Sequence, residues 1–317
     1  MAYFLLIIGF LLLIKGADFF VDGSSQLAAY MRVPTVIIGL TIVALGTSAP
    51  EAAVSIAAGI KGSSSLAISN VVGSNLFNTL VVIGVCALIK PFKIDKQILR
   101  RDLPVNMAVT ILLFFLVRNH VLSRTDGLIL LVLIIIYLTV MVKAALSSKD
   151  EEARIEHDPH VEIESHRPRL SLGKCVISII GGLAAVIIGG DVVVDSATAI
   201  ALQLGMSETL VGLTIVAIGT SLPELVTSVV ASRKGDSGLA LGNAVGSNLF
   251  NIMFILGASS AINPIPTTYE NMVDVFVLIC IAVITFIVTR IGENFGRGKG
   301  AMFVAIYAAY TAYIIMR

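Results

Sequence analysis

The amino-acid sequence predicts an all-α integral membrane protein of ten transmembrane helices, arranged as two inverted repeats of five helices each. Of its 317 residues, 56% are hydrophobic and only 14% are charged, and the mean hydropathy is +0.95. This composition is far more apolar than that of a soluble domain. The apolar residues gather in ten stretches, and short motifs recur in the two halves of the chain. These observations together define the expected fold class.

The composition also excludes several classes of protein. The formal net charge is +1 and no basic run is interleaved with aromatic residues, so nucleic acid is not an expected partner. Cys86, Cys175 and Cys280 are isolated in or beside apolar segments. This excludes a disulfide framework or a zinc cluster and predicts that they pack in the core. The lipid bilayer is the expected surrounding, and neither a cofactor nor an obligatory protein partner is indicated.

The ten apolar stretches are taken as the membrane spans, because roughly 20 helical residues cross the hydrocarbon of a bilayer. The first five lie at about 2–22, 33–60, 66–89, 103–117 and 127–146. The second five lie at about 173–195, 208–232, 238–261, 271–289 and 300–316. We therefore expect a first repeat over residues 1–146, a polar linker over 147–172 and a second repeat over 173–317.

The positions of Lys and Arg predict the orientation, because cytoplasmic loops retain these residues. With the N-terminus outside, the loops placed inside hold seventeen Lys and Arg residues, whereas the outside loops and the C-terminus hold four. We therefore expect a multi-pass protein of the cell membrane with both termini outside and the linker in the cytoplasm. The linker is rich in acidic residues and holds three of the four histidines; it is expected to be a solvated connection, with a regulatory metal site as the alternative.

Three motifs recur in the second half of the chain, each 173 residues after its first copy. This spacing is called here the repeat offset. Residues 39–44 match 212–217, and 73–78 recur unchanged as 246–251. The central pair reads Gly-Thr-Ser-Ala-Pro-Glu at 46–51 and Gly-Thr-Ser-Leu-Pro-Glu at 219–224. Five spans in each half is an odd number, so the second copy must enter the membrane in the opposite sense. Inverted repeats of this kind are typical of secondary transporters, which bind substrate near the bilayer midplane where the halves meet.

Each central motif places a carboxylate directly after a proline within an apolar span. A charged side chain at this depth costs about 3 kcal/mol on insertion scales and usually marks an ion or substrate pathway. Pro50 and Pro223 lack an amide hydrogen, so each is expected to bend its helix and to free the carbonyl of Gly46 or Gly219. Non-helical backbone is tolerated there only beside protein or a water-filled cavity. We therefore expect broken helices in spans 2, 3, 7 and 8 around a midplane ion site.

The candidate ligands are all oxygen atoms, which favours a hard cation over zinc or copper. Two bidentate glutamates and two backbone carbonyls would supply about six ligands, the lower end of the range for Ca²⁺. The candidates around the two prolines are Thr47, Ser48, Glu51, Thr220, Ser221 and Glu224. The motif at 73–78 and its copy add the neutral oxygens of Ser74, Asn78, Ser247 and Asn251.

Each motif also has an interpretation without ions. Ser-x-Pro-Glu describes an ordinary helix start, with Ser as N-cap and Pro in the first turn. Gly-Ser-Asn-Leu-Phe-Asn also describes a small-residue packing face with hydrogen bonds between helices. The recurrence of both motifs at one offset favours the ion site. Four other acids, Asp18, Asp22, Asp191 and Asp195, lie near the ends of their spans and are expected to be interfacial.

Together the two motif pairs resemble those of the sodium/calcium exchanger family, within the calcium/cation antiporter superfamily and especially its short microbial members. The resemblance covers nearly the whole chain. It implies a secondary antiporter that exchanges Na⁺ for Ca²⁺ by alternating access, with both ions as substrates and the first and sixth spans sliding to gate the site. Potassium-dependent members carry Asp where this chain has Asn251, so the resemblance implies K⁺ independence.

The resemblance also implies roles for individual residues. Glu51 and Glu224 are the central ligands shared by Ca²⁺ and Na⁺. Thr47 and Thr220 contribute backbone oxygens. The flanking Na⁺ ligands are Ser48, Ser74, Ser221 and Ser247 with the carbonyls of Ala44 and Ala217. Asn78 and Asn251 line the middle of the site.

Three alternatives remain open from the residues alone. In a H⁺/Ca²⁺ antiporter the glutamates would alternate between protonated and Ca²⁺-bound forms, although the hydroxyl-rich second motif favours Na⁺. A passive cation channel would not couple the two fluxes. An intramembrane hydrolase would use paired carboxylates as acid and base, but neither motif supplies a nucleophile with a His partner, so an enzyme is not expected.

Overall fold

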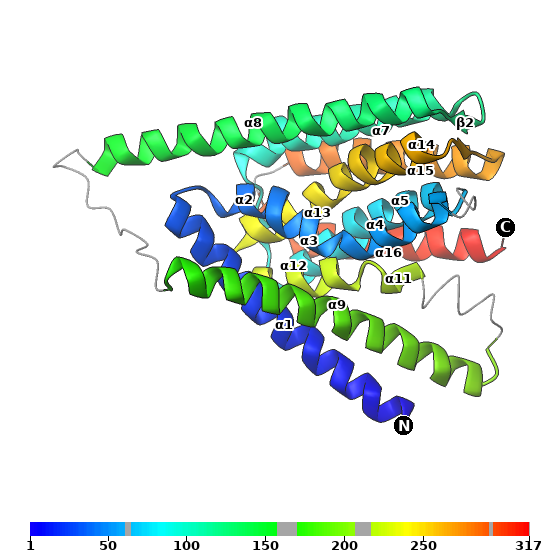
Figure 1. Ribbon diagram of the computed structural model, residues 1–317, viewed down its shortest axis with the longest axis horizontal. Coiled ribbons are helices and arrows are strands. Elements are labelled where there is room, and N and C mark those ends of the chain that lie inside the picture. Colours follow the sequence, from blue (N-terminus) through cyan, green and yellow to red (C-terminus); the bar gives the residue numbers. More distant parts are fainter. Residues whose placement is uncertain (61–64, 157–169, 207–216, 292–293, 317) are drawn as a thin grey trace.

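The computed structural model describes residues 1–60, 65–156, 170–206, 217–291 and 294–316 (Figure 1). The first half contains α1 (Ala2–Met31), α2 (Thr35–Ile38), η1 (Gly39–Val43), α3 (Ala44–Thr47), α4 (Ala49–Ile60), α5 (Ser65–Phe77), η2 (Asn78–Val82), α6 (Ile83–Ile89), η3 (Ile98–Asp102), α7 (Leu103–Val117) and α8 (Arg124–Glu156), where η marks a π-helical turn. The second half contains α9 (Leu172–Gln203), α11 (Ala217–Gly219), α12 (Leu222–Lys234), α13 (Ser237–Phe250), η5 (Asn251–Leu256), α14 (Gly257–Ile262), α15 (Tyr269–Arg290) and α16 (Arg297–Met316). The described chain is therefore almost wholly helical, as expected.

Seven helices of the described residues are long and apolar enough to cross a bilayer, and residues 35–47 with 49–60 form an eighth candidate that is bent by 49°. The helix α7 has 15 residues and coincides with the expected span at 103–117. The expected span at 208–232 begins outside the described residues. The chain is thus a multi-pass membrane protein by length and composition, whereas the full set of ten spans stays a prediction.

Three helices are longer than the apolar stretches that predicted them. The helix α1 continues to Met31 and α9 to Gln203, and α8 continues to Glu156, inside the expected linker. A helix satisfies its own backbone hydrogen bonds, so it need not end where the hydrocarbon ends. The histidines of the linker lie outside the described residues, so the structure does not test the alternative of a metal site there.

The helices α1 and α9 pack against each other through regularly spaced glycines, and they form one layer along the lower edge of Figure 1. A Cβ atom built on Gly16 would lie 2.9 Å from the carbonyl oxygen of Gly182, and one on Gly189 would lie 2.9 Å from that of Gly9. Small residues let membrane helices approach closely. These two helices, which correspond to the expected first and sixth spans, therefore touch backbone to backbone.

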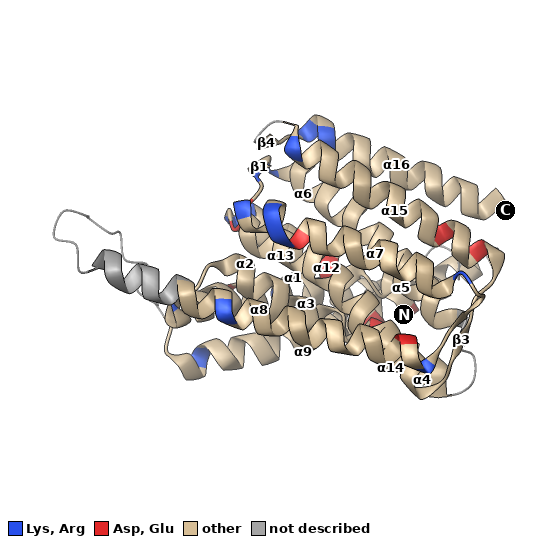
Figure 2. Cartoon of the chain, turned by 90° about the horizontal axis from the view of Figure 1, so that it is seen from above, with Lys and Arg blue, Asp and Glu red and all other residues tan. Residues whose placement is uncertain are grey.

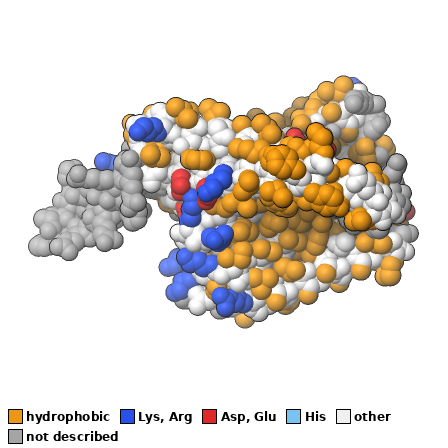
Figure 3. Space-filling view, turned by 90° about the horizontal axis from the view of Figure 1, so that it is seen from below, with side chains coloured by type: hydrophobic (Ala, Val, Ile, Leu, Met, Phe, Trp, Pro, Cys, Tyr) orange, Lys and Arg blue, Asp and Glu red, His pale blue; other side chains and the backbone are white. Residues whose placement is uncertain are grey.

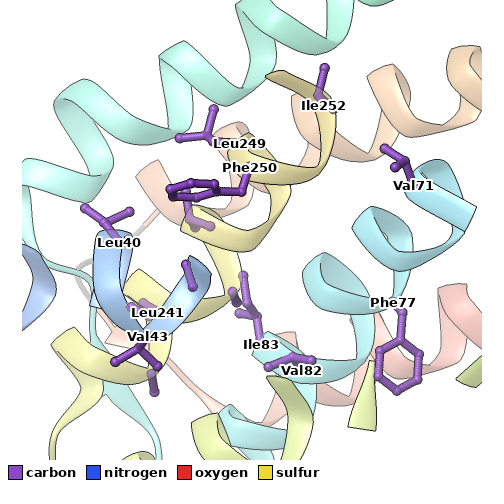
Figure 4. Packing of buried hydrophobic residues seen from close by; sticks show 14 of the residues in the cluster. Leu40, Val43, Val71, Phe77, Val82, Ile83, Leu241, Leu249, Phe250 and Ile252 are labelled. Atoms are coloured by element: carbon purple, nitrogen blue, oxygen red, sulfur yellow. The ribbon is translucent and has the colours of Figure 1, made fainter. Parts of the chain in front are cut away.

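The helix α13 lies at the centre of the protein, and all its residues from Leu239 to Phe250 are buried. Figure 4 shows Leu241 and Phe250 of α13 packed with Leu40 and Val43 of η1. The helices α12, α3 and α2 also contact α13. This core holds the polar motifs in place, because closely packed side chains leave few alternative positions.

Two pairings of two-residue strands join the halves. Strand β1 (Phe92–Lys93) pairs antiparallel with β4 (Asn294–Phe295), and β2 (Val121–Leu122) pairs antiparallel with β3 (Ile265–Pro266). The repeat offset carries β1 onto β3 and β2 onto β4. The second pairing is therefore the first with the two halves exchanged.

Hydrophobic side chains cover the flank of the molecule, as Figure 3 shows. Lys and Arg residues gather at the end opposite the C-terminus, as the blue segments of Figure 2 show. Cys86 and Cys175 are buried, but Cys280 is exposed. The prediction that all three cysteines pack in the core is therefore wrong for Cys280, because an apolar span has a lipid-facing side as well as a buried one.

Candidate ion-binding site

The two central motifs break their helices in the same way. The breaks expected in spans 3 and 8 are not found, because Leu66–Ile89 and Ser237–Ile262 each run as one helix that contains a π-helical turn. The helix α3 ends at Thr47 and α4 begins at Ala49, with Ser48 between them at φ −81° and ψ 7°. In the second half Ser221 precedes α12 at φ −95° and ψ 7°. Glu51 and Glu224 thus both lie in the first turn of a helix, where the helix dipole favours negative charge.

The broken helices place each glutamate against the serine of the opposite motif. Ser48 Oγ donates a hydrogen bond of 3.0 Å to Glu224 Oε1, and Ser221 Oγ donates one of 3.1 Å to Glu51 Oε1. Both glutamate side chains are fully buried. Ser221 makes no side-chain bond to its own helix, so the helix-start interpretation describes its position but not the partner of its hydroxyl.

Two asparagines hold the glutamate-bearing helices, and the sequence analysis did not select either. Asn70 Nδ2 donates to the carbonyl oxygen of Glu51 at 3.4 Å and to Ser55 Oγ at 2.9 Å. Asn243 Nδ2 donates to the carbonyl oxygen of Glu224 at 3.4 Å and to Ser228 Oγ at 3.0 Å. The repeat offset carries each member of the first set onto its counterpart in the second, so it was a signal that would have found them.

The second motif joins the halves through its asparagines. Asn251 Nδ2 donates to Asn75 Oδ1 at 3.0 Å, and Asn75 Nδ2 donates to the carbonyl oxygen of Asn248 at 3.1 Å. Asn248 Nδ2 donates to Thr79 Oγ1 at 2.8 Å. The repeat-equivalent position of Thr79 is Ile252, which has no hydroxyl, so this network is not symmetric. Asn75 and Asn248 lie inside the motif that predicted the site but were not chosen as candidates.

Several buried polar atoms of the candidate set make no hydrogen bond with any residue that the structure describes. They are Glu51 Oε2, Glu224 Oε2, Ser74 Oγ, Asn78 Oδ1 and Nδ2, Thr220 Oγ1 and Asn251 Oδ1. A buried polar group without a partner costs about 1 to 3 kcal/mol, so such groups are uncommon in folded proteins. All but one of these atoms are oxygens, the atom type that Na⁺ and Ca²⁺ require.

The remaining candidates lie on the same broken helices or on their neighbours. The carbonyl oxygen of Ala44 is 3.5 Å from Ser247 Oγ, which also donates to Glu224 Oε1 at 3.4 Å. Ser74 and Asn78 are buried on α5 and η2, and α5 packs against α4 and α11. The backbone of Ala217 begins α11, although its side chain lies outside the described residues.

The acids near the ends of the spans do not join this buried set. Lys234 Nζ lies 2.8 Å from Asp22 Oδ1 and 3.4 Å from Asp18 Oδ1, and all three side chains are at least one-third exposed. Asp191 and Asp195 are exposed. Within the described ranges no three His, Cys, Asp or Glu residues gather into a possible metal site, so the donor set consists of two carboxylates with neutral oxygens.

The fold and this site define a class of protein, namely multi-pass membrane transporters with a buried polar site between two related halves. The protein-family model described as "Sodium/calcium exchanger protein" matches residues 1–143 and 174–316 of this chain. The chain therefore belongs to the sodium/calcium exchanger family.

Known relatives agree with this assignment. The chain is 35% identical over 316 residues to the inner membrane protein YrbG of Escherichia coli, covering 98% of this chain and 95% of the relative. It is 33% identical to the sodium/calcium exchanger MaX1 of Methanosarcina acetivorans, covering 97% of each chain. A solved structure of the sodium-calcium exchanger NCX_Mj superimposes with a TM-score of 0.83 at 31% identity, covering 99% of this chain and 98% of that one.

These findings establish the coarse function. The protein is a transporter rather than an enzyme, and it belongs to a family of antiporters that carry Na⁺ and Ca²⁺. The hydrolase interpretation is therefore excluded.

Proposed function

We propose that this protein exchanges Na⁺ for Ca²⁺ by alternating access, without K⁺, at a site centred on Glu51 and Glu224. The observation that carries the proposal is the arrangement of their carboxylates. One oxygen of each accepts a hydrogen bond from the serine of the other half, and the second oxygen is buried without a partner in the described part of the chain. A bound cation would satisfy both free oxygens.

The charge of the site supports Ca²⁺ as one substrate. Among the described residues no Lys, Arg or His forms an ion pair with Glu51 or Glu224. Two uncompensated charges in a water-poor interior are costly, and one Ca²⁺ would balance them. An empty site would carry that cost when it changes the side to which it is exposed. This favours the change in the ion-loaded protein and so couples the two ion fluxes.

Neutral oxygens beside the carboxylates support Na⁺ as the other substrate. Ser74 Oγ and the side-chain oxygens of Asn78 and Asn251 are buried and have no hydrogen-bond partner within the described ranges, and they add ligands without adding charge. Asn251 is an amide that donates to Asn75, so this position supplies no third negative charge. That absence of charge supports exchange without K⁺, and by resemblance three Na⁺ exchange for one Ca²⁺.

The described contacts also support the inverted repeat and the proposed orientation. The serine–glutamate bonds and the strand pairings each recur at the repeat offset with the two halves exchanged. Lys and Arg gather at the end where α1, α8 and α12 finish (Figure 2). We assign this end to the cytoplasm, which places both termini outside.

The proposal is tested by Ca²⁺ uptake into proteoliposomes in which Na⁺, K⁺ and H⁺ gradients are varied one at a time. An outward Na⁺ gradient alone is expected to drive uptake, and K⁺ is expected to have no effect. Uptake driven by a pH gradient without Na⁺ would replace this function with H⁺/Ca²⁺ antiport. Unchanged uptake in the Glu51→Gln and Glu224→Gln variants would refute the site.

A further inference from the structure

We propose that Asn243 and Asn70 are positioning residues that act in turn. Asn243 anchors Thr47 when the site is closed on the side where α1 ends, and Asn70 anchors Thr220 when it is closed on the opposite side. This inference deepens the proposed function and rests on its alternating access. It assigns to two asparagines outside the ion-ligand set the task of linking closure to the glutamates.

The two asparagines hold equivalent places in the two halves. Each uses its amide nitrogen to hold the carbonyl oxygen of a glutamate and the hydroxyl of a serine one turn further along the same helix. The amide oxygen of each is then left to accept a hydrogen bond from elsewhere. Any partner of that oxygen is thereby connected to a glutamate-bearing helix.

The amide oxygens are used differently in the two halves. Asn243 Oδ1 accepts a hydrogen bond of 2.9 Å from Thr47 Oγ1, a threonine of the opposite motif, and both side chains are fully buried. The equivalent hydroxyl, Thr220 Oγ1, is buried but has no hydrogen-bond partner among the residues that the structure describes. Thr220 and Asn70 are only half-buried as residues. The sequence symmetry therefore predicts a second threonine–asparagine bond that this conformation does not make.

The Thr47–Asn243 bond lies on the side of the site where polar contacts join α1 to the core. Asp236, the N-cap of α13, accepts hydrogen bonds from Ser25 Oγ of α1 at 2.9 Å and from Thr35 Oγ1 of α2 at 2.7 Å. Lys234 pairs with Asp22 of α1 at 2.8 Å. Asn243 lies two turns beyond Asp236 on α13, about 10 Å along the axis. It donates to Ser228, which lies between Glu224 and Lys234 on α12, so it is on the same side of Glu224 as Lys234.

The conformational equilibrium follows from these contacts. A conformation that opens the α1 side must separate elements that Thr47 and Asn243 now join. The opposite side would then close and bring Thr220 to the amide oxygen of Asn70. One hydrogen bond would replace the other, so the number of these threonine–asparagine bonds would not change, and the amide oxygen of Asn243 would be released on the side that opens.

The experiment compares Thr47→Val with Thr220→Val, because valine keeps the shape of threonine and removes its hydroxyl. Amide hydrogen exchange is measured in the purified full chain in detergent, over a peptide containing residues 44–52. Exchange of this peptide reports the population of the conformation that is open on the α1 side. Residues 300–312 of α16 serve as a control for global unfolding.

The two variants are expected to act in opposite directions. Thr47→Val removes the bond present here and should speed exchange of residues 44–52 by about 2- to 10-fold, the effect of losing one hydrogen bond. Thr220→Val removes the bond of the alternative conformation and should slow exchange of the same residues by about the same factor. Thr47→Ser and Thr220→Ser keep the hydroxyl and should restore the wild-type rates.

The result for Thr220→Val decides the matter. Thr47 Oγ1 also lies 3.1 Å from the carbonyl oxygen of Val43, so faster exchange in Thr47→Val has a local explanation as well. A merely structural defect at Thr220 would not protect residues on the other half. Unchanged or faster exchange of residues 44–52 in Thr220→Val would overturn the inference; if α16 also exchanges faster, the same comparison is made with Thr220→Ala.

Ion flux is measured separately, so that the two proposals fail in different ways. Wild-type protein that carries no Na⁺-driven Ca²⁺ flux would refute the proposed function whatever the exchange rates are. Wild-type flux together with parallel effects of the two valine variants on exchange would refute only the roles of Asn70 and Asn243.

Discussion

The contact between α1 and α9 gives a prediction that two adjacent glycines test. Gly182 faces α1, and a Cβ atom there would lie 2.7 Å from the carbonyl oxygen of Gly16 and 2.9 Å from Cα of Phe20. Real Cβ contacts are longer than 3.0 Å, and the obstructing atoms are backbone. Gly182→Ala must therefore push the two helices apart, whereas Gly181→Ala meets no atom within 4 Å.

The magnitude follows from comparing these two variants. Alanine gains about 0.5 to 1 kcal/mol over glycine in a helix interior, and this gain is shared because both positions lie within α9. Overpacking of a filled interface costs about 1 to 3 kcal/mol. Gly182→Ala should consequently be about 1 to 3 kcal/mol less stable than Gly181→Ala, after the shared gain has cancelled.

The assay is reversible unfolding in mixed detergent micelles, followed by Ca²⁺ flux in proteoliposomes. The free energy of unfolding should fall in the order Gly181→Ala, wild type, Gly182→Ala. Because the first and sixth spans are expected to gate the site, Gly182→Ala should also slow flux while leaving Ca²⁺ affinity near its wild-type value. Equal stability of the two variants would refute the reasoning that the helices touch through their backbones.

Three further predictions concern the candidate ion site. Glu51→Gln and Glu224→Gln should each weaken Ca²⁺ binding at least ~100-fold, because the loss of one of the two buried charges costs about 3 kcal/mol or more. Calorimetric titration measures the Ca²⁺ affinity of each variant, and a wild-type affinity would contradict this prediction. Ser48→Ala and Ser221→Ala each remove a hydrogen bond to a carboxylate, worth about 1.5 to 3 kcal/mol; their losses of unfolding free energy should agree within about 1 kcal/mol, and a large inequality would contradict the equivalence of the two bonds. Asn251→Asp adds a third charge and should make Ca²⁺ uptake respond to K⁺, whereas a K⁺ response in the wild type would exclude the proposed independence.

Much of the fold could be predicted because lipid imposes a simple rule on the sequence. A spanning segment must be apolar and about 20 residues long, so most segments could be located by reading the chain. The ends of α1, α8 and α9 could not, because polarity marks the edge of the hydrocarbon and not the end of a helix. Cys280 was misjudged for a related reason, since a fully apolar helix does not reveal which of its faces meets lipid.

The candidate site could be predicted as a set of residues but not as a set of contacts. The duplicated motif singled out Glu51 and Glu224, since an acid has few reasons to occupy an apolar span. It did not indicate that each carboxylate meets the serine of the other half. Asn70 and Asn243 were missed because a single asparagine in an apolar helix forms no local pattern. Only their hydrogen bonds to equivalent groups in the two halves show that each holds a glutamate-bearing helix.

Composition and the spacing of residues were sufficient to establish the membrane class, the duplicated motifs and the family. The folded chain was needed to show that Thr47 is bonded to Asn243 while the Thr220 hydroxyl has no partner among the described residues. Two copies of one motif carry the same local information, so the sequence cannot distinguish them. The difference goes with the packing around them, since α1 contacts Lys234 and Asp236 on the side of the site where Thr47 is bonded.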